Sequence, residues 1–211
     1  MKNKILLFLC FVSFSIFAQD YHKQWNEVYE LEQKGSYKSL NSKLEQIYKT
    51  AQKDKNEVQR AKAFIFQMKV ENVLEETNFQ KKVERLRSEI SQSTGIYKEV
   101  FRWYYIKTLM NAYESKFSNW RYFSGVTTNT TDLPKNIDLW TQQQYQEVIL
   151  EQADLLFAQE ALMKKTKVDK IKDLINFDMI DNNLNQSVYD FFAINFINDY
   201  AADSQVIYPS Y

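Results

Sequence analysis

Glycine and proline are scarce in this chain, which holds three glycines and two prolines in 211 residues. Sheets that fold into sandwiches or barrels need frequent turns, and those turns depend on glycine and proline. The chain lacks the turn-forming residues that such a fold requires. Its abundant Glu, Lys, Gln, Leu and Ala favour helices instead. The sequence therefore predicts an all-α protein.

The first nineteen residues, 1–19, have the pattern of a secretory signal peptide. Lys2 and Lys4 give a positive start, an apolar run follows, and Ala18 is a small residue at a plausible cleavage point. A retained membrane anchor is disfavoured because the run is shorter than the roughly 20 residues that span a bilayer. We expect an exported protein of the periplasm or cell surface, with no transmembrane span in the mature chain.

Composition excludes several classes of function. The single cysteine, Cys10, lies inside the predicted signal peptide, so disulfides, thiolate nucleophiles and cysteine zinc sites are not expected. Without Lys2 and Lys4, 25 basic side chains face 27 acidic ones, a net charge of −2. Nucleic acid requires a concentrated basic surface, so we expect no nucleic-acid partner.

Apolar residues at helical spacing predict about seven helices between residues 20 and 200. A two-residue link between the first two makes them an antiparallel hairpin, and the whole is expected to be a TPR-like array or a compact bundle of such hairpins. Residues 201–211 are expected to form an extended tail that could begin a further region. The predicted helices are Tyr21–Lys34, Tyr37–Lys53, Asn56–Glu75, Phe79–Ile90, a long aromatic helix after Gly95, Thr141–Met163 and a last helix capped by Ser187. A further short helix is expected over about Val168–Ile175.

The densest aromatic region runs from Phe101 to Trp140. Its first half has helical spacing, whereas its second half, Ser118 to Asp138, has no period and is too long for an ordinary helix connection. Large apolar side chains lose free energy when they are left in water. We therefore expect Trp120, Tyr122 and Phe123 to hold this loop against the helices.

Further structural anchors are predicted within the helices. Trp25 lies on the inner face of the first helix, and Trp103 lies in the long aromatic helix. Trp140 precedes Thr141 and, three residues on, Gln144, the spacing of a capping box in which each side chain satisfies the other's backbone amide. The cluster around Trp103 could instead form a ligand-binding face, but aromatic residues at helical spacing more often form a core.

No constellation of residues indicates catalysis, a metal or a cofactor. His22 is the only histidine, so neither a histidine-based triad nor a histidine metal site can be completed, and we expect it at the surface. Carboxylate pairs such as Glu27 with Glu30 are expected on solvated helix faces. Asp178 and Asp181 begin an Asn-rich segment without the glycine and ligand alternation of an EF-hand, so a turn is favoured over a calcium site.

The first predicted hairpin resembles a tetratricopeptide-type repeat. Gly35, Ser36 and Tyr37 precede Leu40 and Leu44, as at the start of the second helix of such repeats. Leu40 departs from the small residue usual at its place, and no self-similarity at a period of about 34 residues follows. The resemblance implies TPR-like hairpins and no regular repeat.

Four longer phrases extend over most of the predicted mature chain. They are YHKQWNEVYELEQKGSYKSL from Tyr21, SNWRYF from Ser118, IDLWT from Ile137 and SVYDFFAINFINDY from Ser187. In this order and spacing they resemble the N-terminal helical region of large exported bacterial alpha-2-macroglobulin-like proteins. The resemblance implies a role in a broad-spectrum peptidase-trapping inhibitor, in which the helical region precedes β-sandwich domains.

The chain departs from that family in the parts that carry its chemistry. It has no recognisable sandwich domains, bait segment or Cys-Glu-Gln thioester motif, so no functional residue is carried over. The leading hypothesis is a non-catalytic helical interaction region, a fragment or truncated copy, whose partner is a protein or the downstream macroglobulin-like domains. The alternative is a stand-alone periplasmic TPR-like adaptor that binds a protein or peptide. An enzyme that uses carboxylates near Trp103 and Trp120 is a third hypothesis.

Overall fold

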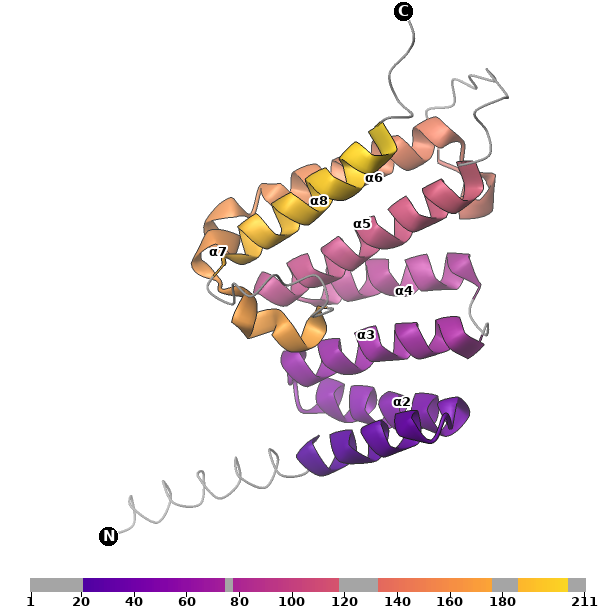
Figure 1. Ribbon diagram of the computed structural model, residues 1–211, viewed down its shortest axis with the longest axis vertical. Coiled ribbons are helices and arrows are strands. Elements are labelled where there is room, and N and C mark those ends of the chain that lie inside the picture. The colour runs from indigo at the N-terminus through magenta and orange to yellow at the C-terminus, as the bar shows by residue number, and fades with distance from the viewer. Residues whose placement is uncertain (1–20, 75–77, 118–132, 176–185, 205–211) are drawn as a thin grey trace, which may run out of the picture. The chain divides into compact units, whose positions relative to one another are not determined.

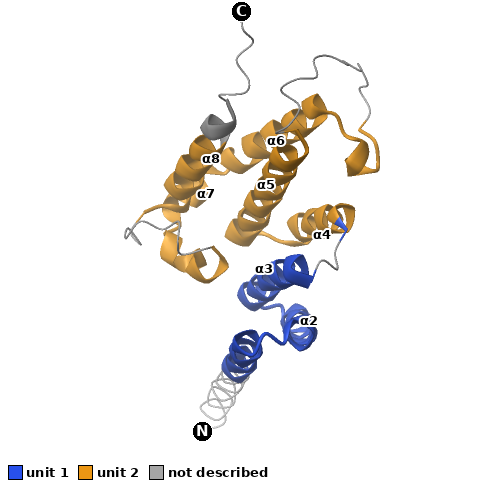
Figure 2. Cartoon of the chain, turned by 45° about the vertical axis from the view of Figure 1, so that its right-hand side comes forward, with its two compact units in different colours: residues 1–78 blue, residues 79–211 orange. Residues whose placement is uncertain are grey.

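The structure is a computed structural model that describes residues 21–74, 78–117, 133–175 and 186–204 (Figure 1). These ranges are predominantly helical and contain no strand; an isolated antiparallel bridge joins Lys167 to Ser187. The prediction of an all-α fold is confirmed. The chain divides into two compact units, residues 1–78 and 79–211 (Figure 2).

The described part of the first unit contains a helix over residues 21–33, α2 (Tyr37–Lys53) and α3 (Glu57–Leu74). The first helix ends at Gly35, whose φ of 64° is accessible to glycine at little cost. The amide of Ser36 donates to the Leu31 carbonyl at 2.9 Å, which closes the helix end in a Schellman motif. The chain then reverses into α2, as the sequence predicted.

An apolar core holds the helices of the first unit together. Helix α2 buries one regular stripe, while α3 is buried over much of its circumference, as expected for a helix between neighbours. Near the end of α3, Val73 is 59% exposed. The buried core residues are Tyr21, Trp25, Val28, Leu40, Leu44, Ile47, Ala51, Ala63 and Val70.

The second unit is organised around its longest helix, α5 (Gly95–Phe117). Helix α5 packs against both α4 (Phe79–Gln92) and α6 (Gln142–Phe157). The short helix α7 (Glu160–Lys165) contacts α5 and α8 (Val188–Ser204). Two 3₁₀ turns complete the described part of the unit, η2 (Ile137–Leu139) before α6 and η3 (Val168–Leu174) after α7.

The single helix predicted over Thr141–Met163 is two helices in the structure. Gln159, with φ −89° and ψ 27°, leaves the helical conformation between α6 and α7. This break turns the chain, so that Met163 is fully buried and Leu162 is only half-buried. The sequence has no helix-breaking residue at this point, so local helix propensity does not explain the break. The break accompanies the burial of Met163 against the rest of the unit.

Helix α8 continues to Ser204, four residues into the segment predicted as an extended tail. Once a helix is nucleated and packed, each further residue adds a hydrogen bond at little cost, and Ala201 and Ala202 are strong helix formers. No helix among the described residues is long and apolar enough to cross a bilayer. Residues 1–19, predicted as a signal peptide, and residues 205–211 lie outside the described ranges.

Candidate functional site

The best-defined polar and aromatic site is the turn at residues 133–140, which leads into α6. Trp140 is buried and folds back over this turn, where its indole N–H donates to the Pro134 carbonyl at 2.8 Å. The hydroxyl of Tyr145, from the first turns of α6, donates to the Ile137 carbonyl at 3.4 Å. Two large aromatic side chains thus hold the turn from its inner side.

Gln80, at the start of α4, holds the turn with both ends of its amide. Its oxygen accepts the backbone N–H of Ile137 at 2.9 Å, and its nitrogen donates to the Lys135 carbonyl at 3.1 Å. Asn136 caps η2 by accepting the N–H of Asp138 at 3.0 Å. The polar backbone groups of this irregular segment are therefore satisfied largely by side chains. This avoids the free-energy cost of leaving buried N–H and C=O groups without hydrogen bonds.

Lys116 closes the turn from the end of α5. Its ammonium donates to the backbone carbonyls of Asp138 at 2.6 Å and Trp140 at 3.1 Å. It also lies 5.3 Å from the ring centroid of Phe117 and 5.5 Å from that of Tyr145, within the range of cation–π attraction. Desolvation lowers the pKa of Lys116, and the charge of Asp138 opposes this shift.

Arg87 supports the turn from α4. Its guanidinium carbon lies 5.5 Å from the ring centroids of both Tyr105 and Trp140, and its Nε donates to the Tyr105 hydroxyl at 2.9 Å. Burial raises the pKa of Tyr105, although the nearby Arg87 charge opposes the shift. The phenol therefore stays neutral and serves as an acceptor for arginine.

The first turn of α6 carries the predicted capping box. The Thr141 hydroxyl accepts the Gln144 amide at 3.3 Å, and the Gln144 side chain accepts the Thr141 amide at 2.9 Å. This confirms the pattern read from the sequence. Beside it, the hydroxyl of Tyr113 on α5 accepts hydrogen bonds from Gln142 and Gln146 at 2.7 and 3.0 Å, which fixes α6 against α5.

The other predicted tryptophan anchors lie elsewhere. Trp103 is buried on α5 and stacks on Phe192 of α8. Trp25 is buried in the first unit, where its N–H donates to Gln59 at 2.6 Å and the Lys62 ammonium lies 4.4 Å from its ring centroid. Trp103 thus packs α5 against α8, and Trp25 packs the first helix against α3.

Trp120, Tyr122 and Phe123 lie outside the described residues. Their predicted role as anchors of the loop therefore stays a prediction. Trp103 and Trp140 have separate sets of aromatic neighbours, Phe192 for one and Tyr145 for the other. Among the described residues, the aromatic side chains form packing contacts at several places.

Sequence reasoning missed a buried ion pair on α5. Arg102 donates to the Glu99 carboxylate at 3.0 Å and to the Gln152 side-chain oxygen of α6 at 3.2 Å, and both charged side chains are buried. Burial raises the pKa of Glu99, and the Arg102 charge opposes the shift. The only signal in the sequence is the i, i+3 spacing of opposite charges within an otherwise apolar helix.

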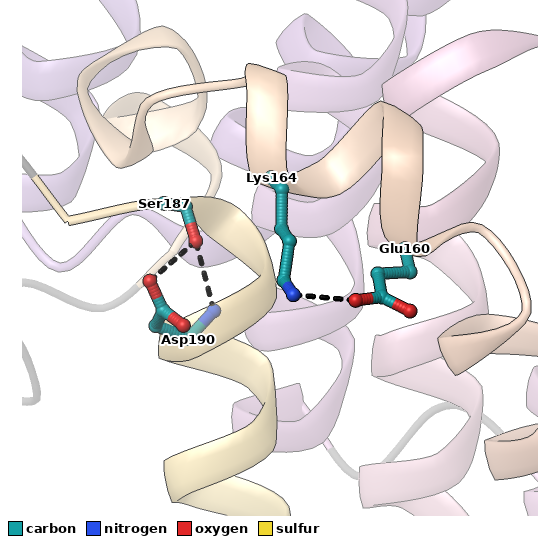
Figure 3. A network of polar contacts seen from close by, with 4 residues as sticks. All are labelled: Glu160, Lys164, Ser187 and Asp190. Atoms are coloured by element: carbon teal, nitrogen blue, oxygen red, sulfur yellow. Dashed lines mark hydrogen bonds and ion pairs between the residues drawn. The ribbon is translucent and has the colours of Figure 1, made fainter.

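A second polar cluster lies where α7 meets α8 (Figure 3). The Ser187 hydroxyl donates to the Asp190 carboxylate at 2.6 Å and accepts the Asp190 amide at 3.1 Å. Lys164 and Glu160 form an ion pair within α7, and this hydrogen bond raises the pKa of Lys164. Ser187 caps α8 as predicted, since its hydroxyl oxygen accepts the backbone amide of Asp190 in the first turn of the helix.

The remaining titratable candidates are on the surface or in simple ion pairs. His22 is exposed, as expected, and Glu27 pairs with Lys43. No group of three or more His, Cys, Asp or Glu side chains in the described ranges is arranged to hold a metal ion. Asp178 and Asp181, considered above for calcium, lie outside those ranges.

Comparisons of this chain with protein-family models, curated proteins and solved structures give no significant match. Its function must therefore be inferred from its own residues. The chemistry of the 133–140 turn is that of a structural joint: amide, ammonium, indole and phenol groups donate to backbone carbonyls or receive bonds from neighbouring helices.

Proposed function

We propose that this chain is a non-catalytic helical interaction region, of the kind that precedes the β-sandwich domains of exported bacterial alpha-2-macroglobulin-like proteins. In this role it acts as a scaffold that contacts a protein partner or the domains that follow it. The proposal includes export to the periplasm or cell surface, with removal of residues 1–19. It would act by binding through its surface, and its buried and hydrogen-bonded residues would keep the helices in place.

The observation that carries this proposal is the use of polar side chains at the 133–140 turn. Gln80 and Lys116 each bond to two backbone groups, and the Trp140 indole bonds to the Pro134 carbonyl. A catalytic or ligand-binding group needs an atom directed at its substrate. Here the donors are directed at the protein's own backbone, which supports a structural role for this turn.

The resemblance to the macroglobulin-like family draws support from where its phrases fall. IDLWT covers η2 and the start of the capping box, and SVYDFFAINFINDY begins at the Ser187 cap and continues through α8. SNWRYF lies outside the described residues. The phrases that can be placed are structural joints and packing faces, which is what a shared helical framework would require.

One sequencing experiment tests the family proposal. We expect the gene downstream of the Tyr211 codon to encode, in the same frame or in an adjacent frame, a series of β-sandwich domains. An immediate stop codon in an intact gene with no such frame nearby would contradict it. The mass of the protein from envelope fractions should correspond to a chain that begins near Asp20, and a mass that retains residues 1–19 would contradict processing.

Activity screens test the non-catalytic part. The purified chain should give only background rates with peptidase and glycosidase substrates. A rate that disappears on substitution of a described carboxylate, such as Glu151→Gln, would instead favour an enzyme. The stand-alone adaptor is favoured over the family proposal if the gene ends at Tyr211 and the intact chain recovers a protein partner from envelope extract.

A further inference from the structure

We draw no further inference here: the strongest candidate, the outer face of α8 on which Ile194 and Ile197 are 50% and 62% exposed, carries none because nothing in the described part of the structure shows what would cover it.

Discussion

The indole of Trp103 on α5 stacks on the ring of Phe192 on α8, with centroids 4.9 Å apart and planes inclined by 18°. Both side chains are buried, and an ion pair between Lys107 and Asp199 joins the same two helices one to two turns farther along. Aromatic stacking of this kind adds to the free energy gained by burying the rings. It is a principal attachment of the last helix to the unit.

Phe192→Ala should therefore lower the free energy of unfolding by about 3–5 kcal/mol, because it removes a fully buried ring and leaves a cavity. Urea denaturation followed by circular dichroism measures the change. Ile197→Ala on the outer face of the same helix is the control and should change stability by about 0.5 kcal/mol or less. Equal losses in the two variants would show that the stack does not hold α8.

Thr141→Ala should cost about 0.5–2 kcal/mol, the usual effect of losing an N-cap side chain. Gln144→Ala should remove the reciprocal bond, and a double-mutant cycle should show that the two losses are coupled. The control is Gln143→Ala, since Gln143 is exposed and its side chain bonds to Glu147 one turn away in the same helix. Purely additive losses at positions 141 and 144 would argue against a working capping box.

Lys116→Met retains the aliphatic stem but removes both hydrogen bonds to the 133–140 turn. Because this side chain is exposed, we expect the free energy of unfolding to fall by about 1 kcal/mol, less than for loss of a buried charged donor. Lys165→Met on exposed α7 should have a negligible effect. Hydrogen exchange should also increase at residues 137–140 in the Lys116 variant alone, and unchanged exchange there would contradict the proposed clamp.

Arg102→Met should destabilise the fold by about 3–5 kcal/mol near neutral pH, because it leaves Glu99 buried without its cation. Burial already raises the pKa of Glu99, and loss of Arg102 removes the main opposing influence. A carboxyl with a raised folded-state pKa binds protons more readily when folded, so its contribution favours folding at low pH and is lost as pH rises through that pKa.

The loss in free energy of unfolding caused by Arg102→Met should consequently be smaller at pH 5 than at pH 7.5. Urea denaturation at the two pH values measures this difference. Combining Arg102→Met with Glu99→Gln is the control, because the titrating group is then absent and the difference between the two pH values should shrink. A deficit that does not depend on pH would show that Glu99 is solvated after Arg102 is removed.

Two phenols should resist ionisation. Desolvation is the main cause that raises the pKa of Tyr104 and of Tyr145 to about 12, and the Tyr104 hydroxyl donates to the Leu174 carbonyl. The folded state holds these protons more tightly than the unfolded state, so the stability they provide is complete below pH 10 and is lost as pH rises toward 12. Tyr104→Phe should flatten this alkaline decline in denaturation experiments. Its ultraviolet titration should lose one late phenol, and loss of an early one would contradict the assignment.

Features encoded by neighbouring residues were the ones predictable from the sequence. Gly35 ends the first helix, Thr141 and Gln144 form their capping box, and Ser187 caps α8. Each depends on side chains within a few residues and on backbone geometry that tertiary contacts leave unchanged. The bounds of α2, Tyr37–Lys53, agree with the prediction for the same reason.

Features that depend on distant partners were not predictable. Gln80 contacts the 133–140 turn across more than fifty residues, and Gln152 reaches Arg102 from another helix. The sequence alone does not show whether the side chain of a glutamine is exposed to solvent or bonds to a distant segment of the chain. The break between α6 and α7 was missed because helix propensity continues through Gln159, while burial of Met163 accompanies the turn in the chain.

The sequence alone determined that this protein is helical and where most of its helices begin, because apolar period, caps and the scarcity of glycine and proline act over short distances. Tertiary structure decided which polar groups are buried together, how the 133–140 turn is held, and that Ile194 and Ile197 are left on an outer face. Those outcomes depend on which helices become neighbours, and that choice is made by packing whole surfaces whose members are far apart along the chain.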